Sequence, residues 1–170
     1  MEFSDVPADA WFHNYVTRVY AGGLVKGYKD GTFRPNAPIT RQELAALIVR
    51  AKALEAPPTG RLHFTDAHQI SPWAKDYISA AANQGWLQGD TVGTLRPRQH
   101  ITRAEAVALF TRALERSDTN SESLRDVRSD LRIFNDVSDP RLWYFYYVVE
   151  ASHNHWFILT NGVSRWTSIN

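Results

Sequence analysis

The sequence predicts a mainly α-helical repeat protein in which copies of one unit pack around a shared axis. Three observations lead to this prediction. A Phe-x-Asp start followed by a tryptophan occurs three times, a glycine-rich turn ending in proline occurs twice, and an Ile-Thr-Arg-x-Glu segment occurs twice. The chain of 170 residues is long enough to bury a core without disulfides, and it contains no cysteine.

The first element of each copy is predicted to be an aromatic helix. The copies start as FSDV at residue 3, FTDA at 64 and FNDV at 134, and each start is followed by a tryptophan and, four residues later, a tyrosine. These pairs are Trp11 and Tyr15, Trp73 and Tyr77, and Trp143 and Tyr147. Residues four apart share a helix face, and Asp9, Ser71 and Asp139 are placed to act as N-caps.

The aromatic helices are expected to form the inner bundle. In the first copy an apolar stripe supports this: Trp11, Phe12, Tyr15, Val16 and Val19. The alternative is that the tryptophans are exposed, in which case their rings would be available to stack on sugars or partners.

The second element is a tight turn, GYKDGTFRP at 27–35 and GDTVGTLRP at 89–97. Gly31 and Gly93 are predicted to have positive φ, and Phe33 and Leu95 to enter the core. The third element is a helix that begins with a capping box, Thr40-x-x-Glu43 or Thr102-x-x-Glu105.

Two arginines stand at the first position of these helices, Arg41 and Arg103. A cation there opposes the helix dipole, so the helix start gives no reason for an arginine. Its repetition suggests recognition of a carboxylate or phosphate by the guanidinium group. A salt bridge to Asp5, Asp66 or Asp136 of a neighbouring copy is the structural alternative.

The predicted organisation is one composite folding unit. It comprises a first repeat at 1–58, a second at 59–116, a polar linker at 117–132 and a truncated third repeat at 133–170. Residues 55–61 form a short linker, and 117–132 are expected to run over the surface with at most a helical turn. The third copy has no second turn and no Ile-Thr-Arg segment, so its aromatic residues are expected to seal the bundle.

Composition and motifs argue against several functions. The net charge of +1 does not reach the basic density of a nucleic-acid binder, and no apolar run is long enough to cross a membrane. No catalytic or nucleotide-binding motif is present. Asp30 stands alone where a calcium loop needs several acids, and His153 and His155 lack the further ligands that zinc requires. We therefore expect no enzyme activity, metal or cofactor.

The repeated motifs resemble S-layer homology repeats of bacterial surface proteins. The resemblance is nearly complete over residues 3–54, extends with changes in the turn over 64–115, and covers only the first half of the unit over 134–170. It implies three repeats around a pseudo-threefold axis, with a central bundle of first helices and prongs made of the turns and second helices.

The resemblance also implies a function and a site. The chain would be an extracellular, non-catalytic module that anchors a larger exported protein to the bacterial cell wall. Its ligand would be a wall polysaccharide, usually a polymer carrying pyruvylated N-acetylmannosamine, bound in grooves between repeats. The implied site residues are the two arginines, the three repeat-start aspartates, the three tryptophans and the turn glycines Gly27, Gly31, Gly89 and Gly93.

Two alternatives remain at this stage. One is an assembly module with degraded sugar grooves that contacts neighbouring surface-layer proteins. The other is a wall hydrolase. Release of soluble sugar or peptide from purified walls would distinguish the hydrolase from the other two.

Overall fold

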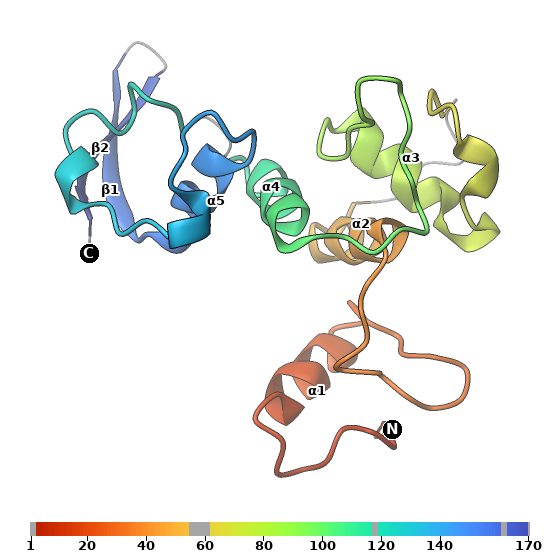
Figure 1. The fold of residues 1–170 in the computed structure, drawn as a ribbon. Helices are drawn as coiled ribbons and strands as arrows, with labels where there is room; N and C mark the ends of the chain where they lie inside the picture. Colours follow the sequence, from red (N-terminus) through yellow and green to blue (C-terminus); the bar gives the residue numbers. More distant parts are fainter. Residues whose placement is uncertain (1–2, 55–61, 117–118, 161–162, 170) are drawn as a thin grey trace. The chain divides into compact units, whose positions relative to one another are not determined.

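The computed structural model describes residues 3–54, 62–116, 119–160 and 163–169, and the chain divides into two compact units (Figure 1). One unit consists of Met1–Asn83 with Leu87–Ile101, and the other of Gln84–Trp86 with Thr102–Asn170. Each unit therefore combines parts of successive sequence copies. The repeat boundaries stay a sequence prediction, and the linker at 55–61 lies outside the described residues.

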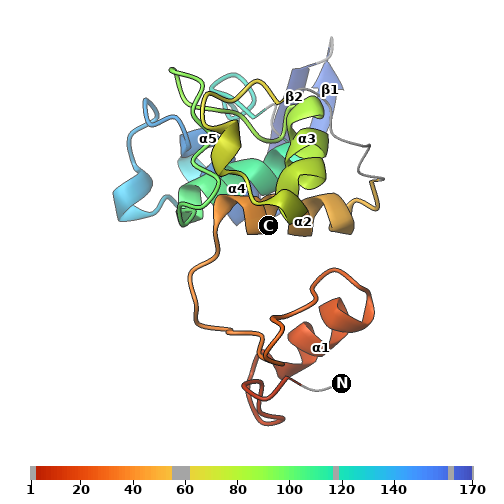
Figure 2. The same ribbon diagram turned by 90° about the vertical axis from the view of Figure 1, so that its right-hand side faces the viewer.

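The first unit contains the helices α1 (His13–Ala21), α2 (Arg41–Ala51) and α3 (Lys75–Asn83), with the short 3-10 turns η1 (Ala67–Gln69) and η2 (Pro72–Ala74) before α3. Helix α2 of the first copy packs against α3 of the second (Figure 2). Both helices bury small and branched apolar side chains: Leu44, Ala45, Ile48, Val49, Ile78 and Ala81. The second helix of one copy thus covers the first helix of the next.

The first helices begin later than the sequence predicted. Helix α1 has Phe12 at its N-cap, and helix α5 (Phe145–Ser152) has Tyr144, in both cases without a side-chain cap. Asp9 and Asp139 therefore do not cap these helices, and that prediction is wrong for both. Ser71 does stand at the N-cap position of η2, followed by Pro72, but its side chain forms no capping hydrogen bond. Asp139 instead accepts hydrogen bonds from the amide and side chain of Arg141, which holds the chain in a turn before α5.

The predicted apolar stripe around α1 is only partly buried. Val16 is buried, whereas Trp11 is 83% exposed and Tyr15 68% exposed. The three tryptophans all lie before their α-helices, where the backbone is in a turn or 3-10 conformation. The expected burial of these rings in an inner bundle is not seen in either unit.

The turns and second helices follow the sequence closely. Gly31 has φ of 80° and Gly93 of 77°, and Leu95 is buried while Phe33 is half-buried. Both capping boxes are present, at the starts of α2 and of α4 (Arg103–Ala113). These parts of the fold depend on contacts within a few residues, which makes them readable from the sequence.

The second unit contains α4, the 3-10 turns η3 (Arg128–Asp130) and η4 (Asn135–Val137), α5, and an antiparallel hairpin of β1 (His155–Thr160) and β2 (Val163–Ile169). Helix α4 packs against α5, as α2 does against α3. The strands pair from His155 with Ile169 to Thr160 with Val163, with a register shift after Trp156. The sequence prediction contained no strand, so the hairpin is an addition to a helix-rich fold.

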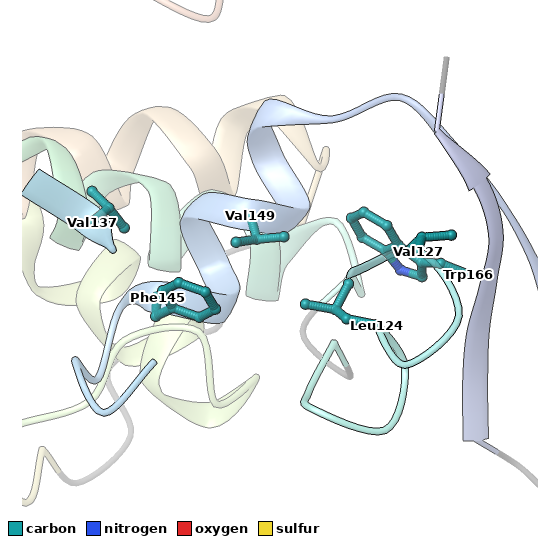
Figure 3. Close-up of a cluster of buried hydrophobic side chains, with 6 residues drawn as sticks. All are labelled: Leu124, Val127, Val137, Phe145, Val149 and Trp166. Carbon is teal, nitrogen blue, oxygen red and sulfur yellow. The ribbon is translucent and has the colours of Figure 1, made fainter. Parts of the chain in front are cut away.

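The core of the second unit joins the polar segment, α5 and the hairpin (Figure 3). It consists of Leu124, Val127, Val137, Phe145, Val149 and Trp166. The segment 117–132 was expected at the surface, yet Leu124 and Val127 are each only 2% exposed. The Ser123 carbonyl also accepts the Trp166 amide at 2.9 Å. Ion pairs from Arg165 to Glu122 and Asp126 also hold this segment against the hairpin. The predicted helical turn corresponds to η3. In the described parts of the chain, none of the helices has the length and apolar character needed to span a membrane.

Candidate ligand-binding surface

The helix starts at Arg41 and Arg103 are capped without the arginine side chains. In α2 the Glu43 amide donates to Thr40 Oγ1 at 3.3 Å, and the Thr40 amide donates to the Glu43 carboxylate at 2.8 Å. The corresponding distances in α4 are 3.2 and 2.9 Å. Both arginines stand at the first helical position, as predicted. Their repetition therefore has no explanation in capping.

The two helix starts nevertheless differ in their surroundings. At α2 the amides of Arg41 and Gln42 donate to the carbonyls of Gln99 and Pro97, each at 3.0 Å, and Thr40 pairs with His100. The turn of the second copy thus covers this helix end, and Arg41 is half-buried. The two carbonyls engage the first amides of α2, so these amides are not available to an anion.

At α4 the helix end is open, because the third copy has no corresponding turn. Arg103 is exposed. Within the described residues, no carbonyl accepts the amides of Arg103 or Ala104, and Arg103 forms no ion pair. The two arginines that look equivalent in the sequence thus lie in different settings, one in a junction between copies and one at the surface.

The junction between the first two copies brings Arg41 and Trp73 into one region. Gln42, next to Arg41, donates from Nε2 to Ser71 Oγ at 3.1 Å and accepts the Ser71 amide at 3.1 Å. Gln42 is 6% exposed, so this pair of bonds is shielded from water. Ser71 precedes Pro72 and Trp73, whose ring is 50% exposed. A buried side-chain amide thus joins the helix start of Arg41 to the loop that carries Trp73.

The second junction lacks this link. Ala104 occupies the place of Gln42 in the capping-box segment and has no side-chain hydrogen-bonding group. Trp143 is 56% exposed, and Trp11, which precedes α1, is more exposed than either. Of the three tryptophans, Trp73 is the one connected to an Ile-Thr-Arg helix start in the described structure.

The repeat-start aspartates have structural partners. Asp5 accepts the amides of Phe33 and Arg34, each at 2.7 Å, and the Phe33 bond is the main cause that lowers the pKa of this carboxyl. Asp66, which is 6% exposed, accepts the amides of Leu95 and Arg96 at 2.8 and 2.7 Å. Each carboxylate ties the start of a copy to its own turn. Asp136 is exposed, in a copy that has no such turn.

The local backbone also explains why glycine occupies the four turn positions. A Cβ at Gly27 would meet the ring of Phe3, and one at Gly89 would lie 3.2 Å from the Gly93 carbonyl carbon. Gly31 and Gly93 have positive φ, which a side chain would strain. The four glycines are thus explained by the shape of the turn, and a contact with ligand remains a sequence prediction for each.

A second pair of arginines, Arg34 and Arg96, was not among the residues predicted from the sequence. Both have positive φ, 60° and 54°, although they are not glycine. Arg34 donates to Asp30 at 2.8 Å and lies 4.0 Å above the Tyr28 ring, while Arg96 donates to Asp90 at 2.6 Å. The repeated Arg-Pro step in TFRP and TLRP indicates that these residues avoid the right-handed helical region, but it does not indicate positive φ.

The first glycine-rich turn also lowers the pKa of Asp30, an aspartate within it. The Thr32 hydroxyl donates to Asp30 at 2.6 Å, and this bond, followed by the one from Arg34, lowers the pKa of Asp30 to about 2. Asp30 is therefore an acceptor for Thr32 and Arg34 within the turn.

The two histidines near the end of the third copy face the protein. His153 bonds to the Val149 carbonyl at 2.9 Å and accepts the Arg132 amide at 3.2 Å. His155 stacks on Trp166 with ring centroids 3.5 Å apart. Across the described ranges of the chain, no group of three residues is arranged to hold a metal ion.

Comparison with known proteins connects these repeats to a family. The S-layer homology domain model matches residues 2–45 and 63–107, more than half of the chain. Cell surface glycoprotein 1 of Acetivibrio thermocellus is 31% identical over 99% of this chain and 7% of its own length. The surface-layer 125 kDa protein of Lysinibacillus sphaericus is 34% identical over 69% of this chain and 10% of its own length.

A third relative is named for anchoring. The cellulosome-anchoring protein of Acetivibrio thermocellus is 34% identical over 83% of this chain and 32% of its own length. The chain thus spans a third or less of each of these relatives. The predicted cell-surface location is confirmed along with the resemblance. The two matched segments coincide with the two copies that carry a turn, a capping box and an Ile-Thr-Arg start, and the chain belongs to the S-layer homology domain family.

Proposed function

We propose that this chain is a non-catalytic anchoring module that holds a larger exported protein on the bacterial cell wall. Its ligand would be an anionic wall polysaccharide, with a carboxylated sugar such as a pyruvate ketal as the recognised group. The observation that carries the proposal is the junction of the first two copies, where the buried Gln42–Ser71 pair connects Arg41 to the loop of Trp73.

The chemistry of this junction suits an acidic sugar. A guanidinium group binds a carboxylate through two parallel hydrogen bonds, and the apolar face of a sugar ring packs on an exposed indole. Arg41 is half-buried, which reduces the screening of its charge by solvent. Arg103 would serve as a second, more exposed contact for the same charged polymer.

Co-sedimentation with purified wall sacculi tests the proposal. Walls are used before and after acid extraction of their secondary polymer, with wild type, Arg41→Ala and Trp73→Ala. Loss of the charged contact is expected to weaken binding by about tenfold or more. Arg98→Ala is the matched control, because Arg98 is an exposed arginine in the turn beside the junction.

The outcomes separate the alternatives. Arg41→Lys keeps the positive charge but loses the paired N–H donors of the guanidinium group. This variant should bind the walls more weakly than wild type at an unchanged melting temperature. Equal binding by all variants, or binding that survives acid extraction, would contradict the proposed ligand. Release of soluble sugar by the purified chain would contradict the non-catalytic role.

A second candidate function is assembly with other surface proteins, and the hairpin favours it. Four successive side chains of β1 are more than half exposed: Trp156, Phe157, Ile158 and Leu159. Apolar surface of this extent is typical of interaction sites. Binding to surface-layer protein in the absence of wall polymer would support this function.

The arrangement of three repeats around a pseudo-threefold axis is likewise a proposal. It is supported by the repetition of one contact, since α2 packs on α3 and α4 on α5. Small-angle scattering of the chain would test it against an extended array.

A further inference from the structure

The same arginine–tyrosine contact joins both pairs of packed helices. Arg50, in the last turn of α2, places its guanidinium carbon 4.8 Å from the ring centroid of Tyr77 in α3. Arg112, in the last turn of α4, lies 4.9 Å from the ring centroid of Tyr147 in α5. The arginine Nε donates to the tyrosine hydroxyl at 3.4 Å in the first pair and 3.2 Å in the second.

Each arginine also bonds back to its own copy. Arg50 donates to the Leu24 carbonyl at 3.2 Å, and Arg112 donates to the Trp86 carbonyl at 3.4 Å. Leu24 and Trp86 each follow a glycine of positive φ that comes shortly after a first helix. In each of the two helix pairs, the arginine guanidinium therefore connects the segment after its own first helix to the tyrosine of the next copy.

The third tyrosine of this series, Tyr15 in α1, has the same local geometry. The rings of Trp11 and Tyr15 lie 6.5 Å apart at 64°, and those of Trp143 and Tyr147 lie 6.5 Å apart at 63°. Yet Tyr15 is 68% exposed, whereas Tyr77 and Tyr147 are half-buried. The Trp–Tyr ring pair at α1 thus has the same geometry as the pair at α5, on which α4 packs.

The chain has no spare helix of the matching kind in its described residues. Arg50 and Arg112 are both engaged, and in the third copy α5 is followed by the hairpin β1–β2. The exposed aromatic face on α1 thus corresponds to a helix that the third copy does not provide.

We propose that the Trp11–Tyr15 face of α1 is a docking site for the second helix of another S-layer homology chain. The partner is an Ile-Thr-Arg-capped helix with small apolar residues on one face and an arginine in its last turn, as in α2 and α4. Its arginine would lie over the Tyr15 ring and donate to the hydroxyl. This inference goes beyond wall binding and gives the module a way to join another module end to end.

A helical peptide tests the docking site directly. The probe has the sequence of residues 38–54, is labelled with a fluorophore and is held helical by a side-chain staple, with its helicity measured by circular dichroism before use. Fluorescence anisotropy of the probe against the chain of residues 1–170 is expected to show saturable binding. Tyr15→Ala in the protein, or the change Arg50→Ala in the peptide, should each weaken it by about tenfold.

The control is Val92→Ala, because Val92 is about as exposed as Tyr15, at 71% against 68%, but lies in the turn of the second copy. It should bind the peptide like wild type, and peptide binding should slow hydrogen exchange of the α1 amides. A helical peptide that does not bind, or that binds wild type and Tyr15→Ala alike, overturns the proposal. The assay contains no wall material, so its failure is distinct from failure of polymer binding.

Discussion

Arg112 stands over the ring of Tyr147 and donates to its hydroxyl from both Nε and Nη2, at 3.2 and 3.1 Å. A double-mutant cycle with Arg112→Ala and Tyr147→Phe should give a coupling free energy of about 0.5–1 kcal/mol. Urea denaturation measures it. Arg128→Ala, at an exposed arginine in η3, should change the free energy of unfolding little; additive effects of the first two changes would contradict the contact.

Asp66 and Asp136 stand at the same position of their copies, but the same change should affect stability at only one of them. Asp66→Asn replaces one of two acceptors for backbone amides with a donor, in a buried setting, so it should destabilise by about 1–3 kcal/mol. Asp136→Asn should be near neutral, since this side chain is exposed. Chemical denaturation of both variants is the measurement, and equal midpoints would count against the structural role of Asp66.

Thr102→Ala removes the hydroxyl that caps α4 and should lower the free energy of unfolding by about 0.5–2 kcal/mol. Thr17→Ala, at an exposed position within α1, serves as the control. Wall binding by folded Thr102→Ala should equal that of wild type, because the cap does not involve the arginine. A variant with normal stability and weakened binding would reverse this assignment.

Trp73→Ala should separate binding from stability. The ring is 50% exposed, so its loss is expected to cost only about 1 kcal/mol of stability, while wall binding falls. Thermal melting and co-sedimentation of the same preparation test both halves. A loss of several kcal/mol with intact binding would identify Trp73 as a core residue.

Acid should weaken the first turn through Asp30. Its pKa is lowered to about 2 in the folded chain from an ordinary value of 3.8, so between these values the unfolded chain binds more protons. The stabilisation is therefore complete above about pH 4 and is lost as the pH falls towards 2. Asp30→Asn should flatten the slope of melting temperature against pH in this window; an unchanged slope would show that Asp30 is not responsible.

The features that the sequence predicted well are local ones. The caps at Thr40 and Thr102 and the positive φ of Gly31 and Gly93 each depend on residues within one turn, and all are present. The two Ile-Thr-Arg arginines are where the sequence placed them. Their different surroundings depend on whether the next copy supplies a covering turn, which is a property of the assembled chain.

The features that were missed depend on distant partners. Nothing near Arg50 in the sequence indicates that it will meet Tyr77, and Leu124 and Val127 lie in a charged segment whose burial requires Trp166. The hairpin did have a local signal. An Asn-Gly dipeptide between WFILT and VSRWTSI, both rich in aromatic and branched residues, is typical of two paired strands.

The packing of α2 on α3 and of α4 on α5 has an evolutionary consequence. Each sequence copy is counted from its Phe-x-Asp motif, but the helices that pack together come from two successive copies. A single ancestral copy would have had an exposed second helix and an exposed first helix, complementary to each other. Joining copies head to tail keeps every such interface intact, because each junction pairs a second helix with the first helix that follows it.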